Sequence, residues 1–411
     1  MVESGDKKAT YLVLFTNTFP YGSGESFLNN EIPYLSARFD KVFIYPSSDS
    51  RKEGERKLPD NTVVKVLHQD DRLSLKIVGT YILYFIKIFF STFIYSKKRW
   101  RYLRYFKSLL HYFSKDLSKA RSIAIEIENN GLSKAVFYDY WLLNSSLSII
   151  YLKQRRLIQG RTVARAHGFD LYDERHLEAV VPFKEFKIRN LDFVSPISKH
   201  GTAYLKEQLG DSQNNKVKTH YLGVKSSNKL PDTSDEKLIV SCSSLFPFKR
   251  VSFIAQALVS VDSSFRWVHF GDGEEMEKVN SIIQKLPSNK QVTLMGARSN
   301  QEILAFYKKN YVSLFISLSE YEGLPVSMME AQSYGIPIIG TNVNGVSEIV
   351  THETGILLEK DFTLDQVATS ISAVLREEAS FERRKIREYF EDRFSADLNY
   401  PKFITEALLN S

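Results

Sequence analysis

Short apolar runs alternate with longer helical stretches along most of the chain, and this alternation limits the folds open to it. Strands separated by helices are typical of parallel sheets that are covered on both faces. The pattern therefore predicts an α/β protein with two series of strands. The first series comprises Tyr11–Phe15, Val42–Tyr45, Ala135–Tyr138, Thr162–Ala166 and Phe193–Ser195, and the second comprises Leu238–Cys242, Trp267–Phe270, Val292–Leu294, Val312–Ser317, Ile336–Ile339 and Ile356–Leu358.

The stretch between the two series predicts a domain boundary. Residues 226–236 are polar, lack periodicity and contain Pro231, as is usual for a surface loop. The 411 residues are enough for two to three domains. We place the boundary at about His220–Gly223.

Composition narrows the classes of protein and partner. The chain is 43% hydrophobic and 25% charged, as in ordinary globular proteins. Its one cysteine, Cys242, excludes an intrachain disulfide and fits a reducing cytoplasm. Residues 1–8 lack the apolar core of a secretory signal. The net charge of +7 indicates an anionic partner, which could be a nucleotide, a phospholipid or a nucleic acid.

Residues 77–107 form an apolar and aromatic segment followed by a basic one. Ile77–Tyr95 is nearly long enough to span a bilayer, but Lys87 lies at its centre. From Ser96 to Lys107 there is no acidic residue, and cations alternate with aromatics. Two readings stay open, a buried helix with a solvated basic face or a surface that docks on anionic lipid headgroups. No nucleic-acid recognition motif accompanies it, so we expect no nucleic-acid partner.

Two carboxylates flank the start of a predicted helix within residues 319–340. Glu322 precedes the helix and Glu330 lies inside it. Pro325 suits the first helical turn, and Gly335 suits the left-handed residue that ends a helix. The helix therefore begins at the carboxyl end of a strand. Open α/β sheets bind ligands there, and exposed backbone amides favour an anion.

Other strand ends in the second half carry cations and glycines. Lys249 and Arg250 follow a strand and would complement a diphosphate near the helix that begins at about Leu324. Gly271 and Gly296 end two further strands. Both glycines permit a close approach of the backbone to a ligand, although each could belong to a simple turn.

The first half offers weaker candidates. Gly22 and Gly24 lie between a strand and a helix, where the backbone and the amides of the helix could meet a ligand. A tight strand-to-helix turn is the simpler reading. His167 stands at the end of a strand, before a glycine, and Asp170 could orient it. A purely structural histidine is the alternative.

Together these residues resemble the GT4 family of retaining glycosyltransferases, which have the GT-B fold. Glu322 and Glu330, with seven residues between them, resemble its E-x7-E element. The resemblance covers essentially all of the second half and is looser in the first, where it rests on Gly22, Gly24 and His167. In the second half it also includes Asn342–Val350, Thr354–Leu358, the Lys249 segment, Gly271-Asp272-Gly273 and Gly296.

The family implies two Rossmann-like domains whose parallel sheets face a central cleft. Residues 1–220 would form the acceptor-binding domain, including the basic aromatic region 77–107. Residues 221–385 would bind the nucleotide sugar. A C-terminal helix over 386–411 would pack back on the first domain.

The resemblance also implies roles for single residues. Lys249 would hold the donor diphosphate, Glu330 would accept hydrogen bonds from the ribose, and Glu322 and His167 would lie beside the transferred sugar. The catalytic set would be His167, Glu322 and Lys249. The donor-binding set would be Gly22, Gly24, Lys249, Arg250, Gly271, Gly296, Arg298, Glu322, Gly323, Leu324, Pro325, Val326 and Glu330. The family needs no bound metal and no cofactor beyond a UDP- or GDP-linked sugar.

The sequence departs from the family pattern at three places. Many members carry Gly-Arg where this chain has Ser243-Ser244, so one usual phosphate cation is absent. Arg250 follows Lys249 where glycine is common, and we hypothesise that Arg250 supplies part of the lost charge. Leu222 replaces the usual asparagine before the Gly-Val linker, which affects only the local geometry of the linker.

The expected function is transfer of a sugar, with retention of configuration, to a hydroxyl of a glycan or lipid-linked acceptor. The setting would be bacterial surface polysaccharide or glycoconjugate synthesis. We expect a cytoplasmic protein, peripheral on the inner face of the cell membrane if residues 77–107 bind lipid. Two alternatives stay open, a soluble-acceptor enzyme of the glycogen- or sucrose-synthase type and a non-catalytic scaffold subunit.

Overall fold

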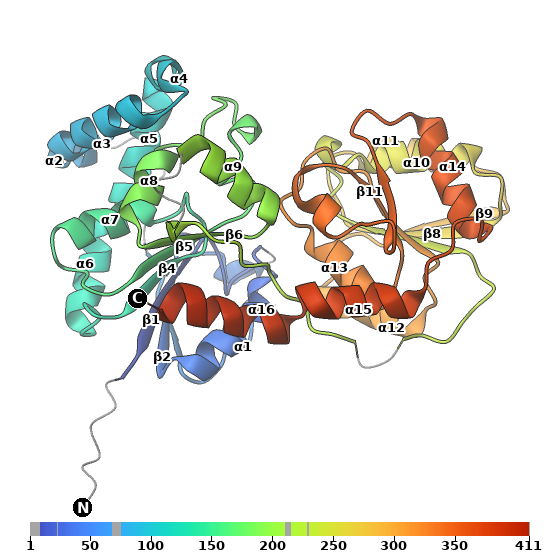
Figure 1. Cartoon of the computed structure of the whole chain (residues 1–411), viewed down its shortest axis with the longest axis horizontal. Helices are drawn as coiled ribbons and strands as arrows, with labels where there is room; N and C mark the ends of the chain where they lie inside the picture. The colour runs from blue at the N-terminus through green and yellow to red at the C-terminus, as the bar shows by residue number, and fades with distance from the viewer. Residues whose placement is uncertain (1–8, 23, 68–74, 210–214, 228–229, 411) are drawn as a thin grey trace, which may run out of the picture. The chain divides into compact units, whose positions relative to one another are not determined.

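The computed structural model describes residues 9–22, 24–67, 75–209, 215–227 and 230–410. These residues divide into two compact units (Figure 1). The first unit runs to Tyr221 and includes the chain again from Tyr400, and the second unit spans Leu222–Asn399. The division lies within the interval that the sequence indicated, His220–Gly223.

The first unit is built on a parallel sheet with the strand order β3-β2-β1-β4-β5-β6. Its strands are β1 (Tyr11–Thr16), β2 (Lys41–Pro46), β3 (Thr62–Val64), β4 (Val136–Asp139), β5 (Thr162–Ala166) and β6 (Phe193–Pro196). Five of them were predicted. The missed strand, β3, has three residues and lies at the edge of the sheet, so its sequence carries little of the periodicity that marks a buried strand.

Helices cover both faces of this sheet because its central strand is apolar on both sides. Leu12 and Leu14 of β1 pack with α1 and the C-terminal residues, while Val13 and Phe15 pack with α6 and α7. The helices of the first unit are α1 (Leu28–Arg38), α2 (Leu75–Thr80), α3 (Ile82–Tyr95), α4 (Arg99–Arg104), α5 (Phe106–Leu117), α6 (Ala120–Asn129), α7 (Ser146–Gln154), α8 (Lys184–Asn190) and α9 (Lys199–Leu209).

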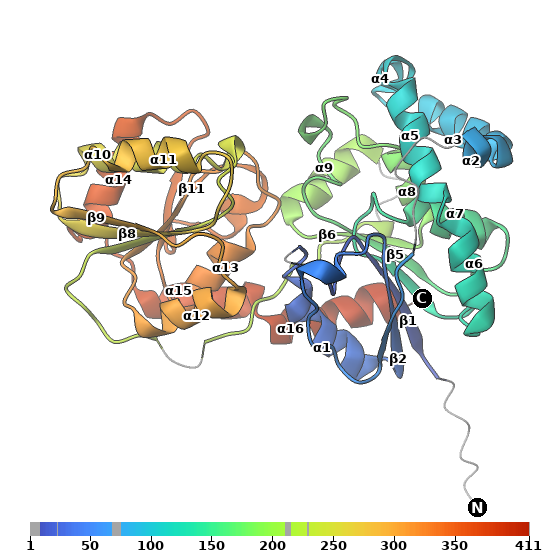
Figure 2. The same cartoon turned by 180° about the vertical axis from the view of Figure 1, so that it is seen from behind.

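The second unit repeats the plan with the strand order β12-β11-β10-β7-β8-β9, again parallel. Its strands are β7 (Leu238–Cys242), β8 (Phe265–Phe270), β9 (Lys290–Leu294), β10 (Leu314–Ser317), β11 (Ile338–Thr341) and β12 (Gly355–Leu358). One face is covered by α10 (Val251–Ser260), α11 (Met276–Ile283) and α14 (Leu364–Leu375), and the other by α12 (Asn300–Lys309), α13 (Val326–Ser333) and α15 (Arg383–Phe394) (Figure 2).

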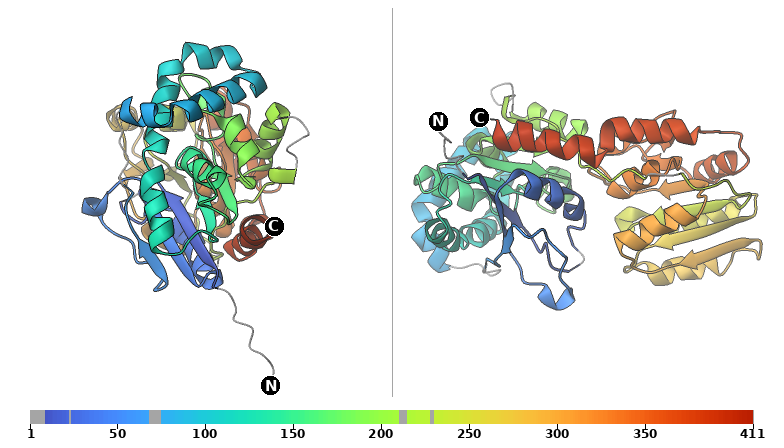
Figure 3. Two further views of the ribbon diagram at one scale, coloured as in Figure 1. Left: turned by 90° about the vertical axis from the view of Figure 1, so that its left-hand side faces the viewer. Right: turned by 90° about the horizontal axis from the view of Figure 1, so that it is seen from below.

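The predicted C-terminal helix over 386–411 is two helices in the structure, and only its last part belongs to the first unit. The chain leaves helical geometry at Ser395, between α15 and α16 (Ala396–Phe403). The apolar side chains of α15 recur every fourth residue, at Ile386, Phe390 and Phe394, and this one face of the helix is buried in the second unit. From Tyr400 onward the chain packs beside α1 (Figure 3), and it ends the described part in a π-helical turn, Ile404–Leu409.

Each sheet has one point where its strand order reverses. In the first sheet this point lies between β1 and β4, and in the second it lies between β7 and β10. Ligands of open α/β sheets bind outside the carboxyl ends of the strands at such points. Gly22 and Gly24 follow β1, Lys249 follows β7 and Glu322 follows β10, which border these points, whereas His167 follows β5, the second strand from the reversal.

Candidate active site

Lys249 and Glu322 meet at the point of strand reversal in the second unit. Lys249 ends the 3₁₀ turn that follows β7, and Glu322 lies in the loop after β10. The Lys249 Nζ donates to Glu322 Oε1 at 2.6 Å, and the two side chains are only 18% and 12% exposed. The chain therefore places a preorganised cation beside a carboxylate at the position where a ligand is expected.

Glu330 lies within α13 and is almost fully buried. Burial raises the pKa of its carboxyl to about 7, although a hydrogen bond from Asn300 opposes the rise. Asn300 Nδ2 donates to Glu330 Oε1 at 2.5 Å. The carboxylate is thus held from one side by an amide, which leaves its other oxygen for a ligand hydroxyl.

Sequence reasoning missed Asn300, although a signal for it was present. Ser299 and Glu302 form a capping box at the start of α12. A serine followed three residues later by glutamate marks a helix N-terminus. That signal would have placed Asn300 in the first turn of a helix at the carboxyl end of β9.

Glu330 and Lys249 both affect the pKa of the Cys242 thiol. Burial raises its pKa to about 12, the nearby Glu330 adds to the rise, and the nearby Lys249 opposes it. Cys242 ends β7. A cation and a carboxyl group therefore lie within electrostatic range of the same strand end.

The loop between Glu322 and α13 is fixed by its neighbours. Asn344 Nδ2 donates to the Glu322 carbonyl at 2.8 Å, and Leu324 is buried. Pro325 is the N-cap of α13 and Val326 is its first residue, so the proline lies one position before the predicted first turn. Gly335 adopts the predicted left-handed conformation after the helix, with φ of 66°.

The amides at this helix start point to an anion site. Within the described part of the second unit, no protein group accepts a hydrogen bond from the amides of Gly323, Leu324 or Val326. Unsatisfied N–H groups at a helix N-terminus attract negative charge.

Arg250 has a backbone conformation that favours glycine. Its φ is 52°, in the left-handed region. Its guanidinium donates to the Lys360 carbonyl at 3.1 Å and lies 3.7 Å from Glu320 and 5.5 Å from the centre of the Phe362 ring. The side chain is thus held near Glu320, and its proposed role as a replacement phosphate cation stays a prediction.

Gly271 and Gly296 join the ends of β8 and β9. The Gly271 amide donates to the Gly296 carbonyl at 2.9 Å. Gly271 has φ of 145°, and a Cβ there would lie 1.8 Å from the Ser243 carbonyl oxygen, so only glycine fits. Gly296 has φ of 67° and open space around it, and Arg298 is exposed.

His167 lies in the first unit, directly after β5. Its ring is 5% exposed and packs against Trp141 and Tyr140, with ring centres 4.3 and 4.8 Å away. Its backbone amide donates to Asp170, but within the described residues neither ring nitrogen has a hydrogen-bond partner, and Nδ1 lies 3.7 Å from Asp170 Oδ2. A buried polar group without a partner is rare and calls for a ligand or water.

The loop that holds Gly22 and Gly24 is a tight turn with internal partners. The carboxylate of Glu25 accepts hydrogen bonds from three successive amides of the loop, those of Asn17, Thr18 and Phe19. The Gly22 amide donates to the Gly54 carbonyl at 2.9 Å. The first amides of α1 are likewise used, because those of residues 28–30 donate to carbonyls of residues 25–27. The structure therefore favours the tight strand-to-helix turn, which was the simpler reading, and donor contacts of Gly22 and Gly24 stay predictions.

The sequence-predicted set is divided between the units. Gly22, Gly24 and His167 belong to the first, and all other members belong to the second. In the described ranges, no group of three or more His, Cys, Asp or Glu side chains could hold a metal ion.

Comparison with solved structures defines the fold class. The lipopolysaccharide outer core galactosyltransferase WaaB, in its apo form, matches 97% of this chain and 99% of its own chain with a TM-score of 0.67 and 16% identity. Alr3699/HepE of Anabaena, solved in complex with UDP, matches 96% and 98% with a TM-score of 0.63 and 12% identity. The predicted GT-B fold with two Rossmann-like units is confirmed.

Comparison of sequences identifies the second unit more closely. Residues 225–393, within the second unit, match the family model of glycosyl transferases group 1. Over 224 residues the chain is 26% identical to the N-acetyl-alpha-D-glucosaminyl L-malate synthase of Bacillus anthracis, covering 54% of this chain and 52% of that protein. The chain spans about half the length of the curated relatives it matches.

Proposed function

We propose that the protein is a retaining glycosyltransferase of the GT4 type that transfers a sugar from a UDP- or GDP-sugar to a hydroxyl of a glycan or lipid-linked acceptor. The observation that carries this proposal is the Lys249–Glu322 pair beside the start of α13, at the strand reversal of a group 1 glycosyltransferase domain. The UDP in the HepE structure supports the donor class, and the lipopolysaccharide outer core in the name of WaaB supports surface polysaccharide synthesis.

The proposed mechanism depends on stabilising the leaving diphosphate. Lys249 and the amides before α13 supply positive charge in a partly buried site, where preorganised groups act most strongly. Glu322 holds Lys249 in place and positions the donor sugar. The acceptor hydroxyl passes its proton toward the departing phosphate while its oxygen bonds to the anomeric carbon on the same face. His167 lies beside the sugar and needs no acid or base role, and no metal is required.

Glu330 has a separate task in this proposal. Its carboxylate accepts hydrogen bonds from the ribose hydroxyls, with Asn300 fixing its orientation. In this proposal the two carboxylates of the E-x7-E pair bind the donor and do not act as an acid/base couple.

A thermal-shift screen of nucleotide sugars tests the donor assignment. A ligand that binds only the folded state at 100 times its Kd stabilises that state by about 2.7 kcal/mol. We expect one UDP- or GDP-sugar to raise Tm and then to be hydrolysed slowly, and faster when an acceptor is supplied. A donor that binds without any turnover would support the scaffold alternative, and the absence of binding by every nucleotide sugar would contradict the proposal.

We also propose that residues 77–107 bind an anionic membrane surface. Helix α3 presents four apolar side chains to solvent along one face, Leu83, Ile86, Phe90 and Ile94. Its opposite face is buried, and Lys87, which is exposed, donates from its Nζ to Gln154 of α7 at 3.3 Å. No described helix is long and apolar enough to cross a membrane. An exposed apolar face followed by the basic residues of α4 suits the boundary between acyl chains and anionic headgroups.

Vesicle co-sedimentation tests this surface. We expect the protein to sediment with vesicles of phosphatidylglycerol and phosphatidylcholine at low salt, and less so at high salt. Replacing both Leu83 and Phe90 with serine should weaken binding by more than tenfold, because each buried apolar side chain contributes about 1.5–3 kcal/mol. Leu177→Ser, at an exposed leucine outside α3, is the matched control and should not change binding. Failure of the unaltered protein to sediment at low salt would remove the membrane proposal.

A further inference from the structure

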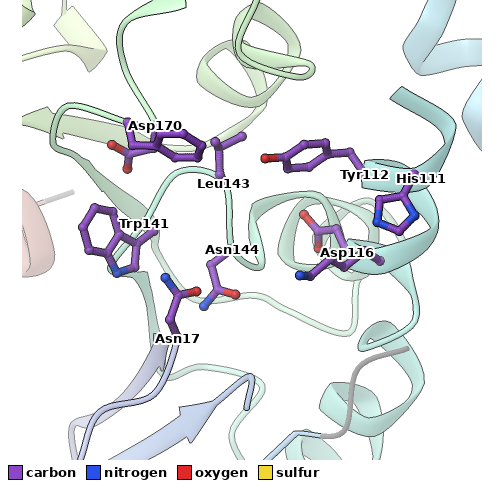
Figure 4. Close-up of a pocket in the computed structure, with 10 residues that line it drawn as sticks. Asn17, His111, Tyr112, Asp116, Trp141, Leu143, Asn144 and Asp170 are labelled. Atoms are coloured by element: carbon purple, nitrogen blue, oxygen red, sulfur yellow. The ribbon is translucent and has the colours of Figure 1, made fainter. Parts of the chain in front are cut away.

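A cavity of about 290 Å³ lies at the strand reversal of the first sheet. Asn17 follows β1, Trp141 follows β4 and Asp170 follows β5, and all three line the cavity. Its opposite wall is α5, which contributes His111, among others (Figure 4). Cavities at this place in an open α/β sheet are the usual ligand sites.

The strand-end wall has groups suited to a sugar. Trp141 is held in position because its Nε1 donates to Glu25 at 2.6 Å. Asp170 is buried and already accepts hydrogen bonds from the amides of Leu142 and His167, which fixes its carboxylate beside the cavity. A rigid aromatic side chain next to fixed carboxylate and amide groups can cover the apolar face of a sugar ring and bind its hydroxyls.

The helix wall has groups suited to a phosphate. His111 and Lys115 lie one turn apart on α5, so they share a face, and both line the cavity. Asp116 also lies on this wall, and its carboxylate accepts hydrogen bonds from the amides of Leu147 and Ser148 at the start of α7. Those amides satisfy the carboxylate oxygens of Asp116, while His111 and Lys115 provide nitrogen donors for a phosphate.

The same helix face connects the cavity to the basic aromatic region. Lys107 precedes His111 by one turn and is exposed. The side chains of Lys107, His111 and Lys115 therefore form a basic track along α5. Helix α5 begins directly after α4, where Trp100 and Leu103 are exposed. Groups suited to a sugar, two nitrogen donors and an exposed apolar surface thus follow one another along the first unit.

We propose that this cavity binds the acceptor as a sugar phosphate, with the sugar on Trp141 and Asp170 and the phosphate on His111 and Lys115. The basic track then leads to the lipid that carries this phosphate. This inference rests on the proposed function and names its acceptor class as a lipid-linked glycosyl phosphate. His167 touches both Trp141 and Asp170, so a sugar hydroxyl in the cavity lies close to the proposed catalytic histidine.

Tryptophan fluorescence of the full chain tests the proposal without any donor. The chain has three tryptophans, and a Trp100→Phe background leaves Trp141 and the fully buried Trp267. We expect glucose 1-phosphate to change the emission and to bind more tightly than either glucose or inorganic phosphate. Lys115→Met and His111→Gln should each weaken that binding about tenfold, as expected for loss of one charge-assisted hydrogen bond.

The control is Lys134→Met, at an exposed lysine before β4, at the amino end of the sheet. It should leave the affinity unchanged, and circular dichroism should show that all variants are folded. Binding of glucose as tight as that of its phosphate, or no effect of either α5 variant, would overturn the phosphate assignment. Inorganic phosphate binding as tightly as the ester would overturn the sugar assignment. Because no donor is present, these outcomes are independent of whether the protein transfers a sugar.

Discussion

Replacing Lys249 with alanine should lower kcat about 100-fold or more for the nucleotide sugar that gives the largest thermal shift. Loss of one preorganised charge contact to a developing anion has an effect of this size. The variant also leaves Glu322 without its 2.6 Å partner in a site that is only 12% exposed. Steady-state release of the nucleoside diphosphate, measured on the folded variant, checks the prediction.

A second ion pair in the same unit supplies the control. Lys278 donates to Glu275 at the same distance, 2.6 Å, at the start of α11. Lys278→Ala therefore removes a pair of equal geometry that the proposed mechanism does not use, and turnover should not change. Near-normal kcat in folded Lys249→Ala would show that Lys249 does not stabilise the leaving group.

Donor affinity should rise about tenfold between pH 6 and pH 8 because of Glu330. Burial raises the pKa of this carboxyl to about 7, so about a tenth of the molecules carry the ionised form at pH 6 and most carry it at pH 8. The ionised form accepts hydrogen bonds from both ribose hydroxyls. Titration of the preferred nucleotide sugar at both pH values measures the effect, and Glu330→Gln should abolish the difference.

The same carboxyl should make stability depend on pH in a defined direction. Between its ordinary pKa of 4.5 and about 7, the folded state holds a proton that the unfolded chain has lost. The free energy of unfolding therefore falls as pH rises through this window, by about 3 kcal/mol, and stays lower above it. Urea unfolding of Glu330→Gln should lack this component.

A donor affinity that is independent of pH in the unaltered protein would contradict the role of Glu330.

Most of the fold could be predicted because the strands are short apolar runs buried on both faces. The limits of β5 and β7 agree with the prediction to the residue. Two features of the fold could not be predicted from the sequence, and each has a physical reason. β3 is too short to show a pattern, and the break in the C-terminal helix at Ser395 depends on which unit buries each side chain, which no local signal reveals.

The parts of the site that could be predicted are those whose charged residues directly follow strands in the sequence. The meeting of Lys249 and Glu322 confirms that the two segments converge, as expected from their places after β7 and β10. Hydrogen bonds formed between residues that tertiary packing brings together were not predictable. Nothing in the sequence shows that Glu25 takes the amides beside Gly22, or that Asn300 reaches Glu330, because both contacts depend on tertiary packing.

The return of the chain to the first unit at Tyr400 has a consequence for protein synthesis. Arg165 is fully buried beneath the ring of Phe403, 3.8 Å from its centre, and its guanidinium also donates to Tyr138 and to the His220 carbonyl. Phe403 leaves the ribosome only after the whole second unit has been translated. Until then the first unit holds a charged side chain under an open hydrophobic surface. The domain that is made first is therefore completed last.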